Sequence, residues 1–217
     1  MLKEAIQSHA LMRRPRNEHV IRAVVWDLGG VVLKQTMENF FPRFCSRANI
    51  PLKDFKKSWK VWKDSLLRGK RSVVDFCRYL EQKFEKGGLV KIWKECYREN
   101  EVNEEVVKLL NETKEYGLLA GLISNTVDLN AKINEERGVF ELFDIVVLSC
   151  NVGFVKPEAQ IFLKFLKSAN LNADECIFVD DRRIHVKKAW EFGFRATLFD
   201  GKIEKLRKFV FTFVHQQ

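Results

Sequence analysis

Short apolar runs rich in β-branched side chains recur along the chain, with longer amphipathic segments between them. Runs of this kind, without polar alternation, are typical of strands buried on both faces of a parallel sheet, because helices cover both sides. Regular alternation of such runs with helical segments predicts an α/β fold with a Rossmann-like, three-layer core. The predicted strands are Ala23–Trp26, Leu118–Ile123, Ile145–Leu148, Ile177–Val179 and Ala196–Phe199.

Helix signals lie between the later runs. Asn103 is an N-cap candidate, the segment Asp128–Arg137 stops at a glycine, and Arg183–Phe192 also stops at a glycine. Pro157 is predicted to be the first residue of a further helix, where a missing N–H costs nothing. The apolar tail 209–214 is compatible with an extra edge strand or with an extension of the last helix.

The spacing of the runs is uneven, because Trp26 ends the first and Leu118 begins the second. The intervening stretch is helical throughout and too long for a single crossover connection, so we expect an inserted α-helical cap domain over residues 37–100. The core would then comprise residues 21–36 and 101–217, preceded by a variable leader over residues 1–20 that includes a short helix. The cap helices are predicted at Met37–Ala48, Asp54–Arg68, Ser72–Glu85 and Leu89–Arg98.

Composition restricts the function classes. The 217 residues include 38 Lys and Arg against 29 Asp and Glu, a net charge of +9 that suits anionic ligands. No nucleic-acid recognition motif accompanies these charges, so nucleic acid is not an expected partner. The densest basic stretch is interleaved with Phe55, Trp59 and Trp62, which share a helical spacing and are predicted to be a buried stripe.

The five cysteines form no C-x-x-C pair, which disfavours a disulfide framework and favours a reducing, cytoplasmic location. No apolar run reaches the roughly 18 residues of a membrane-spanning helix, so we expect no membrane partner. The sequence carries no signal for the oligomeric state.

Polar side chains follow the predicted strands at the edge where parallel sheets bind their ligands. Asp27 follows the first strand, Ser124 the second, Lys156 the third, and Asp180 and Asp181 the fourth. Three clustered carboxylates repel one another unless a cation neutralises them, and Mg²⁺ prefers oxygen ligands. A hydroxyl and an ammonium group suit a phosphate. The residues therefore predict a Mg²⁺-dependent phosphoryl-transfer site in which a carboxylate can act as the nucleophile.

The same four positions resemble the haloacid dehalogenase-like hydrolase superfamily, in the subgroup with a helical cap between the first and second motifs. The matching segments, in order, are Trp26-Asp-Leu-Gly-Gly-Val, Leu122-Ile-Ser-Asn-Thr, Val155-Lys-Pro-Glu and Phe178-Val-Asp-Asp. This resemblance implies a phosphatase that acts on a small phosphorylated metabolite through an aspartyl-phosphate intermediate.

Roles follow from the resemblance, position by position. Asp27 would be the nucleophile, and Ser124 and Lys156 would bind the phosphoryl oxygens. Asn125 would either order the loop or lie next to the phosphate. The Mg²⁺ ligands would be the carboxylates of Asp27 and Asp181 and the backbone carbonyl of Gly29, with Asp180 either as a further ligand or as a residue that supports the others.

Two positions depart from the family pattern. Gly29 stands where most of these phosphatases have a second Asp that protonates the leaving group. This leaves open a slower phosphatase, a catalytically weak binding protein, or a metal-independent 2-haloacid dehalogenase, although the pair Asp180-Asp181 speaks against the last. His185 stands where the family usually has Asn, and it is expected either to make a local hydrogen bond or to supply the missing acid.

Overall fold

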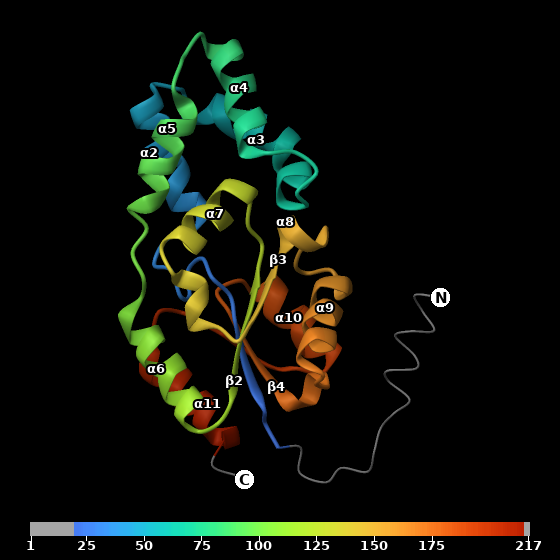
Figure 1. Ribbon diagram of the computed structural model, residues 1–217. Helices are drawn as coiled ribbons and strands as arrows, with labels where there is room; N and C mark the ends of the chain where they lie inside the picture. Colours follow the sequence, from blue (N-terminus) through green and yellow to red (C-terminus); the bar gives the residue numbers. More distant parts are fainter. Residues whose placement is uncertain (1–19, 215–217) are drawn as a thin grey trace, which may run out of the picture.

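The computed structural model describes residues 20–214 and contains a five-stranded, fully parallel sheet with the order β3-β2-β1-β4-β5 (Figure 1). The predicted α/β core is confirmed, with strand ends displaced by about one residue. The central position of β1 places its carboxyl end between those of β2 and β4. The strands are β1 (Ala23–Trp26), β2 (Leu119–Ser124), β3 (Ile145–Leu148), β4 (Cys176–Asp180) and β5 (Arg195–Leu198).

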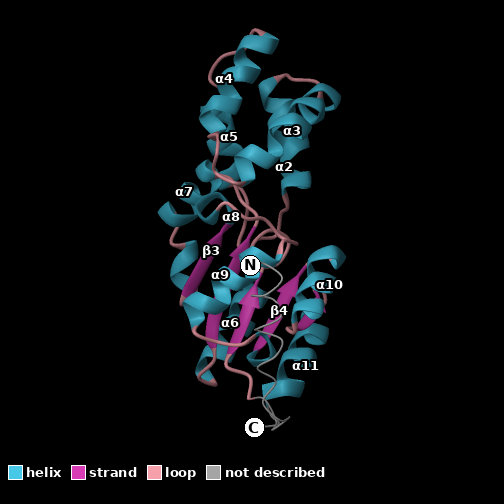
Figure 2. Ribbon diagram, turned by 90° about the vertical axis from the view of Figure 1, so that its right-hand side faces the viewer, coloured by secondary structure: helices cyan, strands magenta, loops and turns pink. Residues whose placement is uncertain are grey.

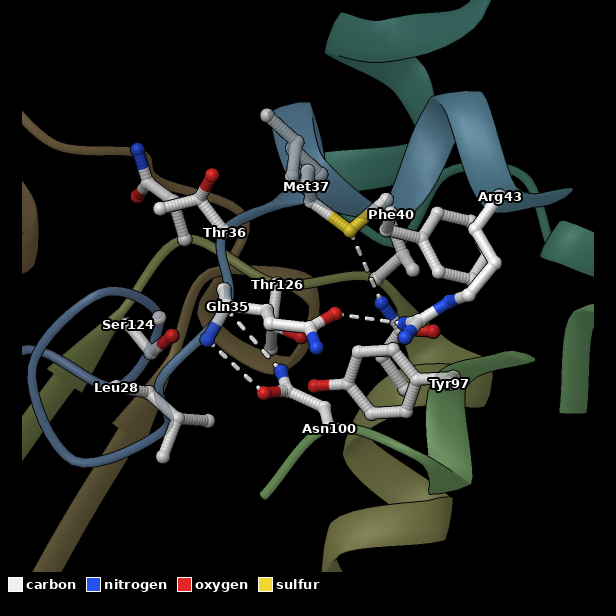
Figure 3. Close-up of a pocket in the computed structure, with 15 residues that line it drawn as sticks. Leu28, Gln35, Thr36, Met37, Phe40, Arg43, Tyr97, Asn100, Ser124 and Thr126 are labelled. Atoms are coloured by element: carbon white, nitrogen blue, oxygen red, sulfur yellow. Dashed lines mark hydrogen bonds between the residues drawn. The ribbon is translucent and has the colours of Figure 1, made fainter. Parts of the chain in front are cut away.

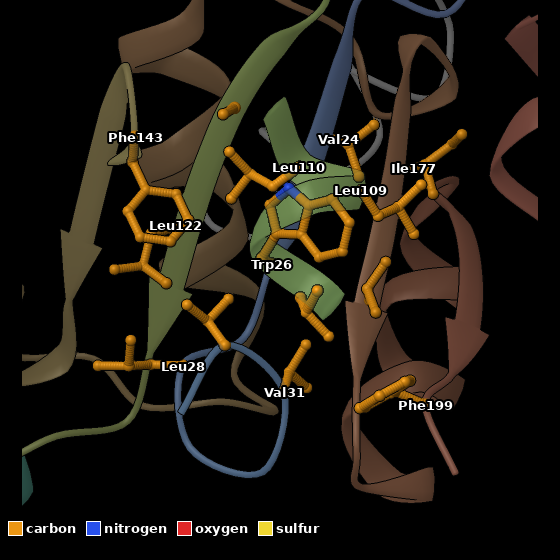
Figure 4. Packing of buried hydrophobic residues seen from close by; sticks show 14 of the residues in the cluster. Val24, Trp26, Leu28, Val31, Leu109, Leu110, Leu122, Phe143, Ile177 and Phe199 are labelled. Carbon is orange, nitrogen blue, oxygen red and sulfur yellow. The ribbon is translucent and has the colours of Figure 1, made fainter. Parts of the chain in front are cut away.

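Two pairs of helices cover the two faces of the sheet (Figures 1 and 2). Side chains of β1 alternate between the faces, as they must in a strand. Val24 and Trp26 pack with α6 (Glu104–Glu115) and α11 (Ile203–Val214), in the cluster shown in Figure 4. The other β1 side chains pack with α9 (Ala159–Ala169) and α10 (Arg183–Phe192). Burial on both faces explains why the strands have continuous apolar sequences.

Four helices between β1 and β2 stand beyond the carboxyl ends of the strands (Figure 1). They share an aromatic cluster in which Phe55 and Trp59 are buried and Trp62 packs at the margin, which confirms the predicted stripe. Leu129 and Ile133 also join this cluster, so the helical block is seated on the edge of the sheet that carries the polar residues. The helices are α2 (Met37–Ala48), α3 (Leu52–Leu67), α4 (Val73–Phe84) and α5 (Leu89–Arg98).

One local prediction is wrong, and one alternative that the sequence left open is decided. Pro157 is not the first residue of a helix, because it lies in a turn after a cis Lys156–Pro157 peptide bond and α9 begins only at Ala159. Of the two alternatives for the tail 209–214, the helix is confirmed and the edge strand is not formed. The tail belongs to α11, whose residues Val210 and Val214 are one helical turn apart and are buried against the sheet.

The remaining elements include α7 (Asp128–Glu136), which follows β2, and the four-residue α8 (Ser149–Val152), which follows β3 and is too short to give a periodic signal. The described part of the chain also contains two 3₁₀ turns, η1 (Val139–Leu142) and η2 (Ala173–Glu175). The predicted leader helix lies outside the described residues. Within residues 20–214, no helix combines the length and apolar character needed to cross a bilayer.

Candidate active site

The register of the central strands brings Asp27 and Asp180 together. Trp26 on β1 pairs with Val179 on β4, so the next residue of each strand lies at the same edge of the sheet. The Asp27 N–H continues the ladder by donating to the Val179 carbonyl at 2.8 Å. Ser124, the last residue of the neighbouring β2, is also buried at this edge. Three of the predicted site residues therefore converge because their strands are parallel and adjacent.

Lys156 links the two aspartates. Its side chain is fully buried, and Nζ donates to Asp27 Oδ1 and to Asp180 Oδ2, both at 2.6 Å. Burial alone would lower the pKa of Lys156, but the two carboxylates outweigh it and raise that pKa. Burial raises the pKa of Asp27, and Lys156 opposes the shift. The ammonium group thus favours the ionised form of Asp27 that a nucleophile requires.

Asp181 completes a group of three acids. One oxygen from each of Asp27, Asp180 and Asp181 lies within 4.8 Å of the others. The Asp181 Oδ1 atom is buried without a hydrogen-bond partner. Burial, followed by the charges of the other two aspartates, raises the pKa of Asp181 to about 6. Gly30 permits this approach, because its φ is +82° and a Cβ there would lie 2.4 Å from Asp181 Oδ2.

The donor set of this cluster fits a hard divalent cation. Three carboxylates face one ammonium group, and an unsatisfied buried oxygen has a high free-energy cost. Magnesium binds through one or two carboxylates and other oxygen ligands. The unpartnered Asp181 oxygen is the feature of the site that most directly indicates such an ion.

His185 lies beside Asp180. Its buried ring places Nδ1 at 3.0 Å from both Asp180 oxygens, and the Arg182 N–H donates to Asp180 Oδ1 at 2.8 Å. Burial opposes ionisation of Asp180, yet Lys156 and His185 together lower its pKa to about 2. The local hydrogen bond expected for His185 is present and its partner is Asp180. A role as the missing acid stays a prediction.

Asn125 holds the backbone of Lys156. Its Oδ1 accepts from the Lys156 N–H at 2.7 Å, and its Nδ2 donates to the Lys156 carbonyl at 2.9 Å. Both ends of the amide are therefore engaged in fixing the loop between α8 and α9. The loop-ordering role expected for Asn125 is therefore present, but its partner Lys156, 31 positions away, could not be predicted from the sequence. Contact of Asn125 with a substrate stays a prediction.

A cavity of about 50 Å³ adjoins this edge of the sheet and extends to the helical block (Figure 3). Leu28 and Ser124 lie on one side of the cavity, and Arg43 of α2 and Tyr97 of α5 lie on the other. Gly29 and Asn125 also line the cavity. Gly29, Ser124 and Asn125 are predicted site residues, whereas the lining residues of the helical block were not predicted, because their position depends on how the helices sit on the sheet. The further lining residues are Gln35, Thr36, Met37, Phe40, Leu67, Asn100, Thr126, Val127 and Asn130.

Arg68, which follows α3, joins the helical block to the Lys156 loop. It makes a bidentate pair with Glu158, at 2.6 and 3.0 Å, and also donates to the Gly153 carbonyl at 3.1 Å. Glu158 Oε2 in turn accepts from the Val155 N–H at 3.0 Å. Paired N–H donors give a guanidinium–carboxylate contact both strength and direction. Arg68 thus binds the loop on both sides of Lys156, at Gly153 and at Glu158.

Replacing Arg68 by Ala is expected to lower the free energy of unfolding by about 1–2 kcal/mol, because a charge-assisted, half-buried pair is lost. Urea denaturation measures this change. Arg78→Ala is the matched control, since the pair that Arg78 forms with Asp75 is exposed on both sides. Equal denaturation midpoints for the two variants would contradict a structural role for the contact between Arg68 and Glu158.

Together, the fold and this group of side chains define an enzyme of the hydrolase class. The profile of the haloacid dehalogenase-like hydrolase family matches residues 21–187. The chain therefore belongs to that family, and the resemblance inferred from its motifs is confirmed.

Solved structures share the fold at low sequence identity. A predicted HAD-like family hydrolase from Porphyromonas gingivalis superposes with a TM-score of 0.73 at 22% identity, over 88% of this chain and 98% of that one. A HAD family enzyme of Bacteroides thetaiotaomicron, in complex with magnesium and inorganic phosphate, gives a TM-score of 0.70 at 21% identity, over 84% and 96% of the two chains.

Among curated proteins, mouse bifunctional epoxide hydrolase 2 is 20% identical over 210 residues, which is 87% of this chain and 38% of the mouse protein. The rat protein of the same name is 33% identical over 66 residues, or 30% of this chain and 12% of the rat protein. The chain thus spans well under half the length of these relatives.

Proposed function

We propose that the protein is a Mg²⁺-dependent phosphatase that hydrolyses a small phosphorylated metabolite through an aspartyl-phosphate on Asp27. The observation that carries the proposal is the buried Lys156 ammonium between Asp27 and Asp180, with the unpartnered Asp181 oxygen close by. In this proposal residues 21–36 and 101–217 form the catalytic core and residues 37–100 form the cap. The free thiols of the five cysteines support a reducing, cytoplasmic location.

The carboxylates of Asp27, Asp180 and Asp181 and the backbone carbonyl of Gly29 would hold the magnesium ion. Bound there, the ion would neutralise the negative charge that the phosphate and the nucleophile bring together. The B. thetaiotaomicron enzyme, which has the same fold and binds magnesium and phosphate, supports this assignment.

The chain's own residues supply the remaining steps. Lys156 holds Asp27 Oδ1, so the other carboxylate oxygen attacks phosphorus while the bond to the leaving oxygen breaks. The leaving oxygen takes a proton from water and departs as the alcohol. The Ser124 hydroxyl and the Lys156 ammonium donate to the phosphoryl oxygens, where negative charge is concentrated in the transition state. Water then attacks the phosphorus of the aspartyl-phosphate, which releases inorganic phosphate and restores the Asp27 carboxylate.

Gly29 leaves the site without the carboxylic acid that would protonate the leaving oxygen. Gly29→Asp is expected to raise kcat, by up to about 10²-fold, since general acid–base help contributes roughly 10²–10⁴-fold. The backbone has room for the change, because the nearest atom to a Cβ at Gly29 is the Gln35 carbonyl oxygen at 3.5 Å.

The control for this prediction is Gly29→Asn, which has nearly the same shape but transfers no proton. Steady-state phosphate release by the two variants and the wild type gives the comparison. A rate for Gly29→Asp no higher than that of the wild type would mean that the site works around the glycine.

A panel of small phosphate monoesters, assayed for phosphate release with Mg²⁺ and with a chelator, tests the proposed function. We expect release from at least one ester with Mg²⁺ and its loss with the chelator. Metal-independent halide release from a 2-haloacid would favour the dehalogenase alternative. The solved structure of a dehalogenase shares the fold, with a TM-score of 0.63 at 14% identity. Inactivity on every compound would favour a weak, binding member of the family. Because the chain matches only 38% of mouse epoxide hydrolase 2, we do not propose that protein's full activity for this chain.

A further inference from the structure

We propose that the cavity is a subsite for the organic part of the substrate and that it selects phosphate monoesters carrying a carboxylate. The inference rests on the proposed phosphatase function, because the phosphate must lie on the side of the cavity where Ser124 is found. Its basis is the charge and the hydrogen-bonding capacity of the residues at the opposite end.

Arg43 is the only charged residue among the described residues that line the cavity. Its Nη1 atom lies 3.5 Å from Glu99 Oε2, but the other oxygen of Glu99 is paired with Arg47 at 2.5 Å. Two guanidinium groups thus share one carboxylate, and the three side chains together keep a net charge of +1. The Arg43 Nε atom is buried and has no hydrogen-bond acceptor. This end of the cavity therefore favours an anion.

Arg43 also fixes the orientation of Gln35. Its Nη2 atom donates to Gln35 Oε1 at 2.7 Å, as Figure 3 shows, and to the Cys96 carbonyl at 2.9 Å. A guanidinium group offers only donors, so the amide oxygen of Gln35 must face it and the amide nitrogen must point elsewhere. Asn100 holds the Gln35 backbone on both sides, accepting from the N–H at 3.0 Å and donating to the carbonyl at 3.1 Å. Gln35 thus offers the cavity a positioned donor.

Tyr97 contributes a second donor to the lining. Its hydroxyl oxygen accepts from Asn134 Nδ2 at 2.9 Å, which leaves the hydroxyl proton for another acceptor. Burial raises the pKa of Tyr97 to about 12, so the group stays protonated near neutral pH. The donors of Arg43, Gln35 and Tyr97 match a carboxylate on the ligand. An ammonium group on the ligand would be repelled by the positive charge and would meet donors in these three groups.

The dimensions of the cavity limit the ligand to a small one. The volume is about 50 Å³, and the apolar side chains of Leu28, Met37, Phe40 and Leu67 form part of the wall. Such walls accept a short hydrocarbon chain between the two polar ends. The substrate class that fits is a phosphorylated hydroxy acid of a few carbon atoms.

The test compares two esters of similar size, phosphoglycolate and phosphoethanolamine, with Mg²⁺ present. We expect the wild-type kcat/KM to be about 10- to 100-fold higher for phosphoglycolate, chiefly through a lower KM. Charge-assisted hydrogen bonds that only the carboxylate can form would raise its affinity by about this factor. Arg43→Gln and, independently, the isosteric Gln35→Glu should bring the ratio close to one. Arg98→Gln, which removes an exposed pair with Glu136 outside the cavity lining, should leave it unchanged.

Equal kcat/KM values for the two esters in the wild type, or a preference for the amine, would overturn the inference. Calorimetric binding of both esters to the Asp27→Asn variant separates this outcome from failure of the proposed function. Tighter binding of the acid without any hydrolysis by the wild type would support the subsite and contradict the phosphatase. Equal binding of the two esters, or none, would contradict the subsite even where the wild type is active.

Discussion

Replacing Asp27 by Asn is expected to lower kcat for phosphate release by about 10⁴-fold or more, because the variant lacks the attacking carboxylate. Asn has almost the same shape, and Lys156 keeps its contact with Asp180 at 2.6 Å, so the fold should persist. Phosphate release at saturating substrate and Mg²⁺ measures the effect, and circular dichroism verifies the fold.

The matched control for this prediction is Asp200→Asn. Asp200 lies on the surface two residues after the end of β5, outside the group of three acids, and pairs with Lys205 at 2.8 Å, so its replacement should leave kcat nearly unchanged. Removal of a nucleophile lowers the rate by much more than tenfold. If Asp27→Asn kept more than about a tenth of the wild-type rate, Asp27 would therefore not be the nucleophile.

Lys156→Met should give the largest loss of stability. Lys156 is hydrogen-bonded to two carboxylates whose side chains are 10% and 0% exposed. Removing the cation leaves both negative charges buried and close together, which costs about 3–5 kcal/mol. For a chain of this size the loss corresponds to a Tm decrease of roughly 6–20 °C. Differential scanning calorimetry without added metal provides the measurement.

Added Mg²⁺ should raise the Tm of Lys156→Met, since a bound divalent cation replaces part of the missing positive charge. Lys205→Met, which removes an exposed ion pair, controls for the general effect of losing a lysine and should change the Tm little. A Tm of Lys156→Met within a degree or two of the wild type would show that the two aspartates do not depend on Lys156 for their charge balance.

Much of the site could be predicted because parallel strands impose it. Asp27, Ser124 and Asp180 each lie at the carboxyl end of a strand, and the sheet order places those strands side by side. Short apolar runs define such strands well, so the edge that collects their polar residues is also well defined. The approach of Lys156 was expected from its place in the motif order, but its hydrogen bonds with Asn125 could be seen only in three dimensions.

The cavity and the contact between the helical block and the Lys156 loop could not be predicted in this way. Arg43 and Tyr97 lie on helices whose burial pattern indicates an amphipathic packing but not the angle at which they meet the sheet. Arg68 and Glu158 are 90 positions apart, and no sequence periodicity connects them. The prediction for Pro157 is wrong because the fixed φ of proline suits the first turn of a helix and also suits a turn that precedes a helix.

Chemical trapping of the intermediate tests the account most directly. The wild-type protein is mixed with substrate and Mg²⁺, quenched in acid during turnover and treated with borohydride, which reduces an aspartyl-phosphate to homoserine. Peptide mass spectrometry then locates the modified residue. The account predicts homoserine at position 27, and none when substrate is left out or a chelator is added. Steady turnover without modification at position 27, or modification at another aspartate, would contradict it.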